Sequence, residues 1–369
     1  MERNYSIDFV KFFAIFFVVT IHTKPFSNTN ILGTNDLYID FTLNTFARFA
    51  VPFFFLIAGY LFGQKVKQSD KKFNYFKKYI LKLIKLYIYW QLFYLLYDLL
   101  LKSLVSIVKG LNIKSELLNY ISSLNYVKLL YYGEGTSGSH LWYLISLIWC
   151  VLVLFLFYKM NKINHLLILS LILYLIGLFG QSYSGIFNLS IQTRDAIFFG
   201  LFYTTFGFFF AYRADSLLVL IKWKPITYGY LFFAFSFLQI IERALLVKFF
   251  KGNLGDYFLS TILLTISLFF LVLSNSQIGK NSSIVKIGEN SVGIYVIHVF
   301  FINITNLSIG LLNIEFMTKT IVWQLLGTPM VTLVSYIAYN QIQFIKHFLL
   351  LDKNQSKISR NSYFHGRHR

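Results

Sequence analysis

The sequence contains little cysteine, proline or charge, and these scarcities limit the class of protein. Its only cysteine is Cys150, which excludes an internal disulfide and a zinc site built from a cysteine cluster. Four of the 369 residues are prolines, and 13% are charged, against about 25% in soluble domains. The sequence also lacks a Gly-rich phosphate loop of the Walker type and a His-x-x-x-His zinc motif.

Hydrophobic residues are correspondingly abundant, at 56% of the chain, with aromatic residues at 20%. This composition predicts an all-α, polytopic membrane protein with about ten transmembrane helices. The apolar spans are 7–24, 47–63, 79–101, 141–158, 166–180, 196–212, 226–242, 258–274, 290–312 and 320–340. We therefore predict a transmembrane domain over residues 1–342 and a basic cytoplasmic tail over 343–369, without an appended soluble domain.

Lysine and arginine are distributed unevenly between the predicted loops. With the N-terminus inside, the inner segments hold twenty of these residues and the outer segments, including Arg194 and Arg243, hold ten. The positive-inside rule then places both termini in the cytoplasm. The formal charge of +19 is therefore interpreted as a topology signal and not as a nucleic-acid surface. The longest connection, 102–139, falls outside, and within it 111–130 is expected to form an amphipathic interfacial helix.

The first span carries three ionisable side chains, Asp8, Lys11 and His22, on one face. Because an α-helix turns about 100° and rises about 1.5 Å per residue, Lys11 and His22 lie about 20° apart in azimuth and about 16 Å apart in depth. Ionisable groups within a membrane normally face protein or a wet cavity. Two interpretations remain open: Asp8 and Lys11 merely pair at the cytoplasmic interface, or all three line one aqueous crevice.

The second and third spans add further cations. Arg48 enters the second span at a depth comparable to His22, where a guanidinium can hold an anionic or hydroxyl-rich ligand or can simply reach the interface. Lys78, Lys82 and Lys85 follow i, i+4, i+7 spacing and form one basic stripe. Such a stripe suits the phosphates of a coenzyme A donor, although anionic lipid is an alternative partner.

The fourth span opens with His140 and Trp142 at the predicted outer interface. These residues fit either an aromatic belt or a platform on which a sugar stacks.

The ninth span contains Ser291, Tyr295 and His298 on one face, with Glu289 at its cytoplasmic mouth. An intramembrane histidine is more often turned toward protein than toward lipid, so His298 is either a hydrogen-bonded core residue or a catalytic one. No metal site is expected, because metal-ligand spacing is missing among His22, His140 and His298.

Four segments together resemble the acyltransferase-3 family of integral-membrane acyltransferases. They occur in order along essentially the whole chain: Arg3 to His22, Arg48 to Tyr60, His140 to Leu144, and Gly288 to His298.

The resemblance implies transfer of an acyl group, commonly acetyl, from cytoplasmic acyl-CoA to cell-surface glycans. The family's pattern of a basic residue, ten residues and a histidine is matched by Lys11 and His22. Its Ser-Gly-Tyr signature appears as Ala58-Gly59-Tyr60, and its Arg-x-x-Arg pattern is replaced by Tyr79 and Lys82 with Lys78 adjacent.

We therefore expect a multi-pass O-acyltransferase of a bacterial cell membrane, with acetyl-CoA as donor and a hydroxyl of a surface or lipid-linked polysaccharide as acceptor. His22 would act as general base or acyl relay, since an imidazole pKa near 6.5 suits proton transfer at neutral pH. Lys11 and Asp8 would complete the catalytic group, and Lys78, Lys82 and Lys85 would bind the donor. The expected substrate-binding residues are Arg48, Tyr60, His140, Trp142, Glu289, Ser291, Tyr295 and His298.

Two other classes of function remain open. An ion-coupled transporter or flippase of a glycan or polar solute would use the same intramembrane charges as its pathway. An assembly subunit of a polysaccharide synthase is the third reading.

Overall fold

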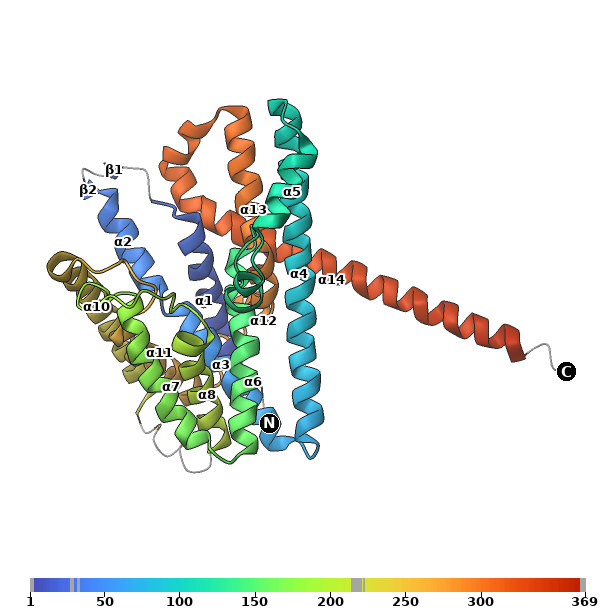
Figure 1. Cartoon of the computed structure of the whole chain (residues 1–369). Helices are drawn as coiled ribbons and strands as arrows, with labels where there is room; N and C mark the ends of the chain where they lie inside the picture. Colours follow the sequence, from blue (N-terminus) through green and yellow to red (C-terminus); the bar gives the residue numbers. More distant parts are fainter. Residues whose placement is uncertain (1–2, 27–29, 32–33, 214–220, 222, 366–369) are drawn as a thin grey trace.

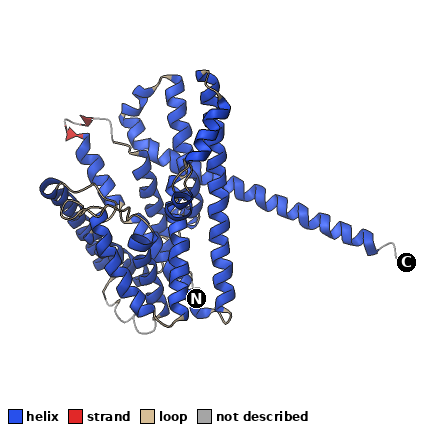
Figure 2. Ribbon diagram, in the orientation of Figure 1, coloured by secondary structure: helices blue, strands red, loops and turns tan. Residues whose placement is uncertain are grey.

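The computed structural model is a bundle of helices with one very short β-ribbon (Figures 1 and 2). It describes residues 3–26, 30–31, 34–213, 221 and 223–365, and the side chains within 3–26, 38–213, 221 and 223–348. In this part of the chain, strand structure is limited to β1 (Asn30–Ile31) paired antiparallel with β2 (Thr34–Asn35).

The helices follow one another along the chain. The first half comprises α1 (Tyr5–Thr23), α2 (Asp36–Ala47), α3 (Ala50–Gln68), α4 (Lys72–Lys109), α5 (Ile113–Ser123), the π-helical turn η1 (Lys128–Tyr132), the 3-10 turn η2 (Ser139–Leu141), α6 (Trp142–Lys159) and α7 (Ile163–Gly177). The second half comprises η3 (Leu178–Gly180), the π-helical turn η4 (Ala196–Gly200), α8 (Leu201–Tyr212), α10 (Pro225–Phe250), α11 (Leu259–Ser274), α12 (Ile284–Glu289), α13 (Ser291–Leu312), η6 (Glu315–Lys319) and α14 (Ile321–His365).

Eight helical segments in the described residues are long and apolar enough to cross a membrane. They are Tyr5–Thr23, Tyr38–Gln68, Lys72–Lys109, Ser139–Lys159, Ile163–Gly180, Pro225–Phe250, Ser291–Leu312 and Ile321–Phe348. The predicted spans 196–212 and 258–274 correspond to two shorter apolar helices, Ala196–Tyr212 and Leu259–Ser274. The all-α membrane architecture is confirmed, whereas the number of ten spans and the cytoplasmic position of both termini stay predictions.

Helix α1 runs through the middle of the bundle and contacts α2, α3, α12, α13 and α14. It begins where the side chain of Asn4 accepts a hydrogen bond from the Ile7 amide at 3.2 Å, which satisfies one of the free N–H groups of the first turn. Its buried face includes Ala14, Ile15 and Val19, each fully enclosed. This central position allows one helix to carry polar groups to both ends of the bundle.

Helices α3 and α8 approach each other closely because each has a glycine at the crossing. A Cβ on Gly59 would clash with the carbonyl oxygen of Thr204, and a Cβ on Gly207 would clash with that of Leu56. Small residues at helix crossings in membranes allow backbones to touch, which increases van der Waals contact. The glycine of the Ala58-Gly59-Tyr60 motif is thus a packing residue.

The chain bends between α2 and α3 at Arg48 and Phe49. Pro52 lies in the first turn of α3 and has no N–H to bond the carbonyl of Arg48 four residues earlier. The interruption separates the two helices and leaves Arg48 at the junction.

Helix α4 is longer than the predicted span 79–101, since its 38 residues extend over about 57 Å. The segment 102–109, expected to be loop, is therefore helical. The expected helix 111–130 is shorter, because α5 ends at Ser123. Asp98 of α4 accepts hydrogen bonds from Tyr120 (2.6 Å) and from the amide of Ser137 (2.9 Å), so it fixes both α5 and the loop that leads to η2.

Helix α14 continues beyond the predicted span 320–340, with Pro329 inside it. Its backbone stays helical to His365, and its C-terminal part leaves the bundle (Figure 1). Residues 343–365 of the predicted tail thus continue the helix, and residues 366–369 lie outside the described part.

Candidate active site

An ion-pair network closes the N-terminal end of α1. Asp8 contacts Lys11 at 3.1 Å and Arg3 at 2.9 Å, and Arg3 also contacts Glu289 at 3.0 Å. Hydrogen bonds to Glu289 and Asp8 raise the pKa of Arg3 above its ordinary value. The predicted pairing of Asp8 with Lys11 is therefore present. Asp8 is about 21 Å along the helix from His22, so the two do not share one reaction centre.

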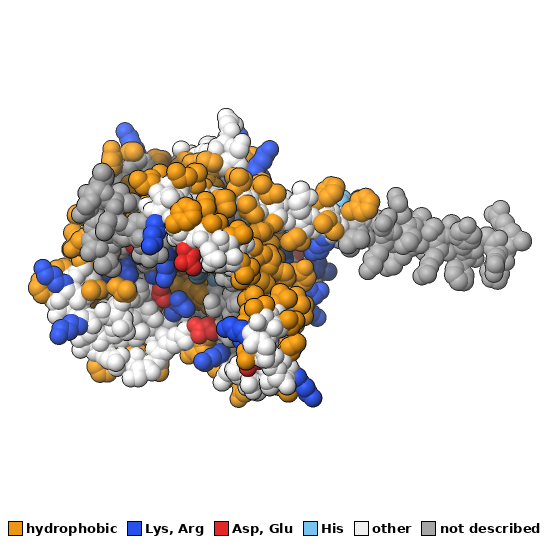
Figure 3. All heavy atoms as spheres, turned by 90° about the horizontal axis from the view of Figure 1, so that it is seen from above, with side chains coloured by type: hydrophobic (Ala, Val, Ile, Leu, Met, Phe, Trp, Pro, Cys, Tyr) orange, Lys and Arg blue, Asp and Glu red, His pale blue; other side chains and the backbone are white. Residues whose placement is uncertain are grey.

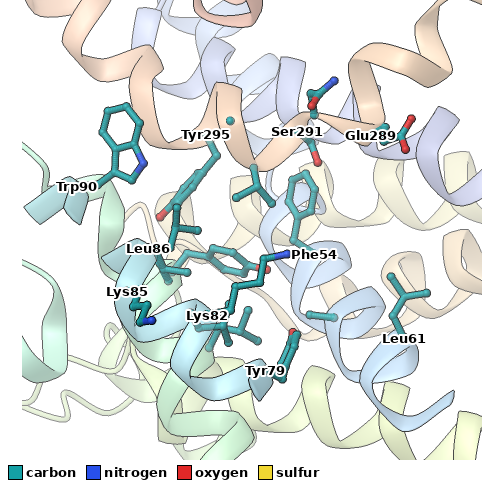
Figure 4. Close-up of a pocket in the computed structure, with 18 of the residues that line it drawn as sticks. Phe54, Leu61, Tyr79, Lys82, Lys85, Leu86, Trp90, Glu289, Ser291 and Tyr295 are labelled. Carbon is teal, nitrogen blue, oxygen red and sulfur yellow. The ribbon is translucent and has the colours of Figure 1, made fainter. Parts of the chain in front are cut away.

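A large cavity of about 2,100 Å³ lies beside this network, between α3, α4, α13 and α14. Figure 4 shows Lys82 and Lys85 on α4, with Ser291 and Tyr295 on the facing wall. Its charged lining is strongly basic, with Glu289 as the single carboxylate among the described lining residues and the lysines Lys11, Lys65, Lys78, Lys82, Lys85 and Lys346. The structure thus brings the predicted donor-binding lysines together with Lys11.

A second cavity of about 410 Å³ lies at the other end of α1. It is lined by three residues named from the sequence, His22, Arg48 and Trp142. It is also lined by charged and polar residues that were not named as candidates: Lys24, Asp40, Asn44, Arg194, Arg243 and Asp256. Figure 3 looks onto the end of the molecule where α1 finishes and shows a hollow bordered by side chains of both charges.

The two cavities have no lining residue in common, so the expected single crevice is replaced by two chambers. Lys11 lines the larger chamber and His22 the smaller. Between them lie aromatic and imidazole rings: Tyr295, which lines the larger chamber, is 5.4 Å from both Tyr143 and His140 between ring centroids. Tight packing of these rings explains why there are two chambers. The division could not be predicted, because no sequence pattern shows which rings from separate helices meet.

The rings of His22, His140 and His298, far apart in the sequence, come together in this layer. Their centroids are 5.0 Å apart for His140 and His298, 5.2 Å for His22 and His298, and 6.4 Å for His22 and His140. His22 is exposed to its chamber, whereas His140 and His298 are buried. None of the described His, Cys, Asp and Glu side chains form a group of three suited to a metal ion.

Backbone contacts determine the tautomers of the two buried histidines. Nδ1 of His298 lies 2.7 Å from the carbonyl oxygen of Tyr295 and must donate to it, which leaves the lone pair on Nε2. Nε2 of His140 lies 3.4 Å from the carbonyl oxygen of Val296, which leaves the lone pair on Nδ1. Neither lone pair has a hydrogen-bond partner among the described residues. Each lone pair is therefore available to accept a hydrogen bond.

Arg48 and Arg194 converge on Asp256 in the smaller chamber. Arg48 donates to one carboxylate oxygen, and Arg194 contacts the other at 3.1 Å. Asn44 accepts further bonds from Arg48 at 2.7 and 3.1 Å. Burial raises the pKa of Asp256, but the two guanidinium groups outweigh this effect and hold it below its usual value.

The remaining sequence candidates have distinct surroundings. Tyr60 lies outside both chambers: it accepts a hydrogen bond from Gln64 at 2.7 Å and packs on Phe269. Trp142 lines the smaller chamber, and the guanidinium carbon of Arg194 lies 5.2 Å from the centre of the Trp142 ring.

Arg243, which the sequence analysis assigned to a loop, lies inside α10 because this helix continues to Phe250. The sequence signal that could have identified Arg243 is the Glu242-Arg243 pair within an apolar stretch.

The comparison with protein families agrees with this architecture. A family model described as an acyltransferase domain matches residues 4–340. The chain belongs to the acyltransferase-3 family. With eight candidate spans among its described residues, this acyltransferase-3 protein is a multi-pass membrane protein of an acyltransferase family.

Two curated relatives are both named amino-acid racemase and both come from Enterococcus faecalis. One is 29% identical over 290 residues, which cover 74% of this chain and 38% of the relative. The other is 30% identical over 232 residues, which cover 58% of this chain and 29% of the relative. The chain thus spans a minor part of each relative's length. No solved structure matches the chain.

Proposed function

We propose that this acyltransferase-3 protein transfers an acyl group, acetyl in the first instance, from acyl-CoA in the larger chamber to a hydroxyl group in the smaller one. The observation that carries the proposal is the position of His22. It lines the smaller chamber, and its ring centroid lies 5.2 Å from that of His298. The His298 ring in turn lies 6.2 Å from that of Tyr295, which lines the larger, lysine-rich chamber. The acceptor we propose is a cell-surface or lipid-linked polysaccharide of a bacterial cell membrane.

The larger chamber suits an anionic nucleotide donor. Its volume exceeds the roughly 300–1,000 Å³ of common small-molecule sites, which leaves room for an extended molecule. Lys78, Lys82 and Lys85 in its lining present ammonium groups to the phosphates of such a donor. Lysine lacks the bidentate fork of arginine, so the phosphates would be held by charge more than by fixed geometry.

His22 supplies the proton transfer in this proposal. It takes the proton of the acceptor hydroxyl while the oxygen attacks the thioester carbonyl. A C–O bond forms and the C–S bond breaks, and the thiolate of coenzyme A receives the proton. For this step the packed rings of Tyr143 and Tyr295, whose centroids lie 5.4 Å apart, must move aside so that the narrow thioester arm can reach the smaller chamber.

Membranes that contain the protein and radiolabelled acetyl-CoA test the proposal. We expect label in the glycan fraction, dependent on His22, with His165→Ala as matched control because His165 is exposed on α7 and lines neither chamber. Wild-type membranes that never transfer label from acetyl-CoA would overturn the assignment.

Ion-coupled transport of a polar solute is the second candidate, favoured by two chambers at opposite ends of α1 with a histidine layer between them. The amino-acid racemase name of the relatives suggests amino acids as solutes to test. Uptake of labelled amino acids into vesicles without any acyl donor would support transport. Label transfer without such uptake would support the acyltransferase.

A further inference from the structure

Arg243 is a buried cation without a carboxylate partner among the described residues. Its side chain is 3% exposed, and it lines the smaller chamber from α10. Nη1 donates to Thr45 Oγ1 at 2.6 Å, and the guanidinium lies 4.6 Å from the centre of the Phe41 ring. These neutral partners satisfy donors but do not neutralise the charge, and Nε remains without a hydrogen bond in the described part. Burying a charge in this way is costly unless an anion pairs with it.

The other charges around this chamber are already partly balanced. Asp256 is shared by Arg48 and Arg194, and Glu134 lies 3.5 Å from Arg194. The described lining still holds four cations (Lys24, Arg48, Arg194 and Arg243) against two carboxylates, Asp40 and Asp256. With Glu134 included the excess is one positive charge, and Arg243 is the buried cation that lacks a carboxylate.

We propose that the acceptor carries an anionic group, a carboxylate or a phosphate, which binds to Arg243 beside Arg48 while the acceptor hydroxyl faces His22. This inference rests on the acyltransferase activity proposed above and specifies its substrate class. A guanidinium fork recognises both kinds of oxyanion through paired hydrogen bonds. Both ends of such an acceptor fit one chamber, because Arg48, Arg243 and His22 line the same 410 Å³ space.

Competition against acetyl transfer in membranes tests this substrate class. Two matched pairs are added as competitors: glucuronic acid with glucose for a carboxylate, and glycerol 3-phosphate with glycerol for a phosphate. We expect at least one anionic member to inhibit transfer to glycan at concentrations at least tenfold below those of its neutral partner. Equal potency within both pairs would overturn the inference but leave the acyltransferase assignment intact. Absence of any transfer in the wild type would overturn the assignment itself.

Variants test whether Arg243 causes the preference for anionic competitors. In Arg243→Gln the tenfold preference should disappear while the KM for acetyl-CoA stays unchanged, and Arg243→Lys should keep part of it. Lys248→Gln is the matched control, since Lys248 is an exposed cation on the same helix outside the chamber. Lys82→Gln should retain the preference, which separates this site from the basic donor chamber. An unchanged preference in Arg243→Gln, with both Arg243 variants extracted as monodisperse protein, would overturn the inference.

Discussion

His22 and His298 lie with their ring centroids 5.2 Å apart, although 276 positions separate them in the chain. His22 comes from the last turn of α1, and His298 from the middle of α13. The carbonyl oxygen of Tyr295 holds Nδ1 of His298 in its protonated form, so Nε2 carries the lone pair. The exposed base therefore has a buried, oriented imidazole directly behind it.

His298 is expected to orient His22 by accepting a hydrogen bond from it when the acceptor is bound. His298→Asn keeps an N–H close to the position of Nδ1 but removes Nε2, whereas His298→Ala removes both. Both variants should lower kcat about tenfold, the value of one hydrogen bond of about 1.4 kcal/mol that Nε2 would accept from His22 only during the reaction, with the KM for acetyl-CoA unchanged. Steady-state kinetics in membranes measures both constants. Full activity in His298→Asn would indicate that only the contact with the backbone matters.

His22→Ala should reduce acetyl transfer by about 10²- to 10⁴-fold at normal membrane levels, because a positioned general base contributes that much. The protein level is checked by immunoblot and the transfer by radiolabel in glycan. His165→Ala serves as the matched histidine control. Near-normal transfer in His22→Ala would remove the base assignment.

The lysine stripe of α4 should govern donor affinity. Lys82→Gln together with Lys85→Gln is expected to raise the KM for acetyl-CoA about tenfold, with little change in kcat. The reason is that a contact which binds the donor equally well in the ground state and the transition state affects KM and not kcat. The salt dependence of KM should also weaken. Lys109→Gln, on the same helix but outside the chamber, provides the comparison. A fall in kcat with an unaltered KM would contradict donor binding here.

The α3–α8 crossing should be sensitive to single methyl groups. Gly59→Ala and Gly207→Ala each push a Cβ into a carbonyl oxygen of the other helix, at a cost of about 1–3 kcal/mol. Thermal unfolding of detergent-purified protein should show a clear loss of Tm in both variants. Gly229→Ala on α10, where a Cβ meets nothing within 4 Å, should keep or slightly raise Tm. Equal Tm values for all three would refute the close crossing.

The pH response of stability should reflect Asp256. Because its pKa in the folded protein lies below the ordinary value of 3.8, its contribution to stability is complete above about pH 4 and is lost as pH falls through the lower folded value. The Tm deficit of Asp256→Asn should therefore be constant between pH 5 and 8. Asp70→Asn, at an exposed carboxylate between α3 and α4, should show no deficit. A deficit that shrinks within that range would be inconsistent with the paired carboxylate.

Local patterns were sufficient for several features. Helical spacing placed Lys78, Lys82 and Lys85 on one face, and all three line the larger chamber. The same spacing paired Asp8 with Lys11, because residues three apart are neighbours on any α-helix. Helix ends were harder to predict, since α4 and α10 continue past the apolar residues that defined their predicted spans. A helix that is supported by packing does not need to end where hydrophobicity ends.

The sequence by itself determined a helical membrane protein, its family, and which side chains lie on one face of each helix. These properties depend on composition and on the fixed geometry of one helix. Only the tertiary structure decided that His22, His140 and His298 meet, that rings divide two chambers, and that Arg243 enters the smaller one. Such meetings depend on how separate helices cross and rotate against one another, which no local periodicity records.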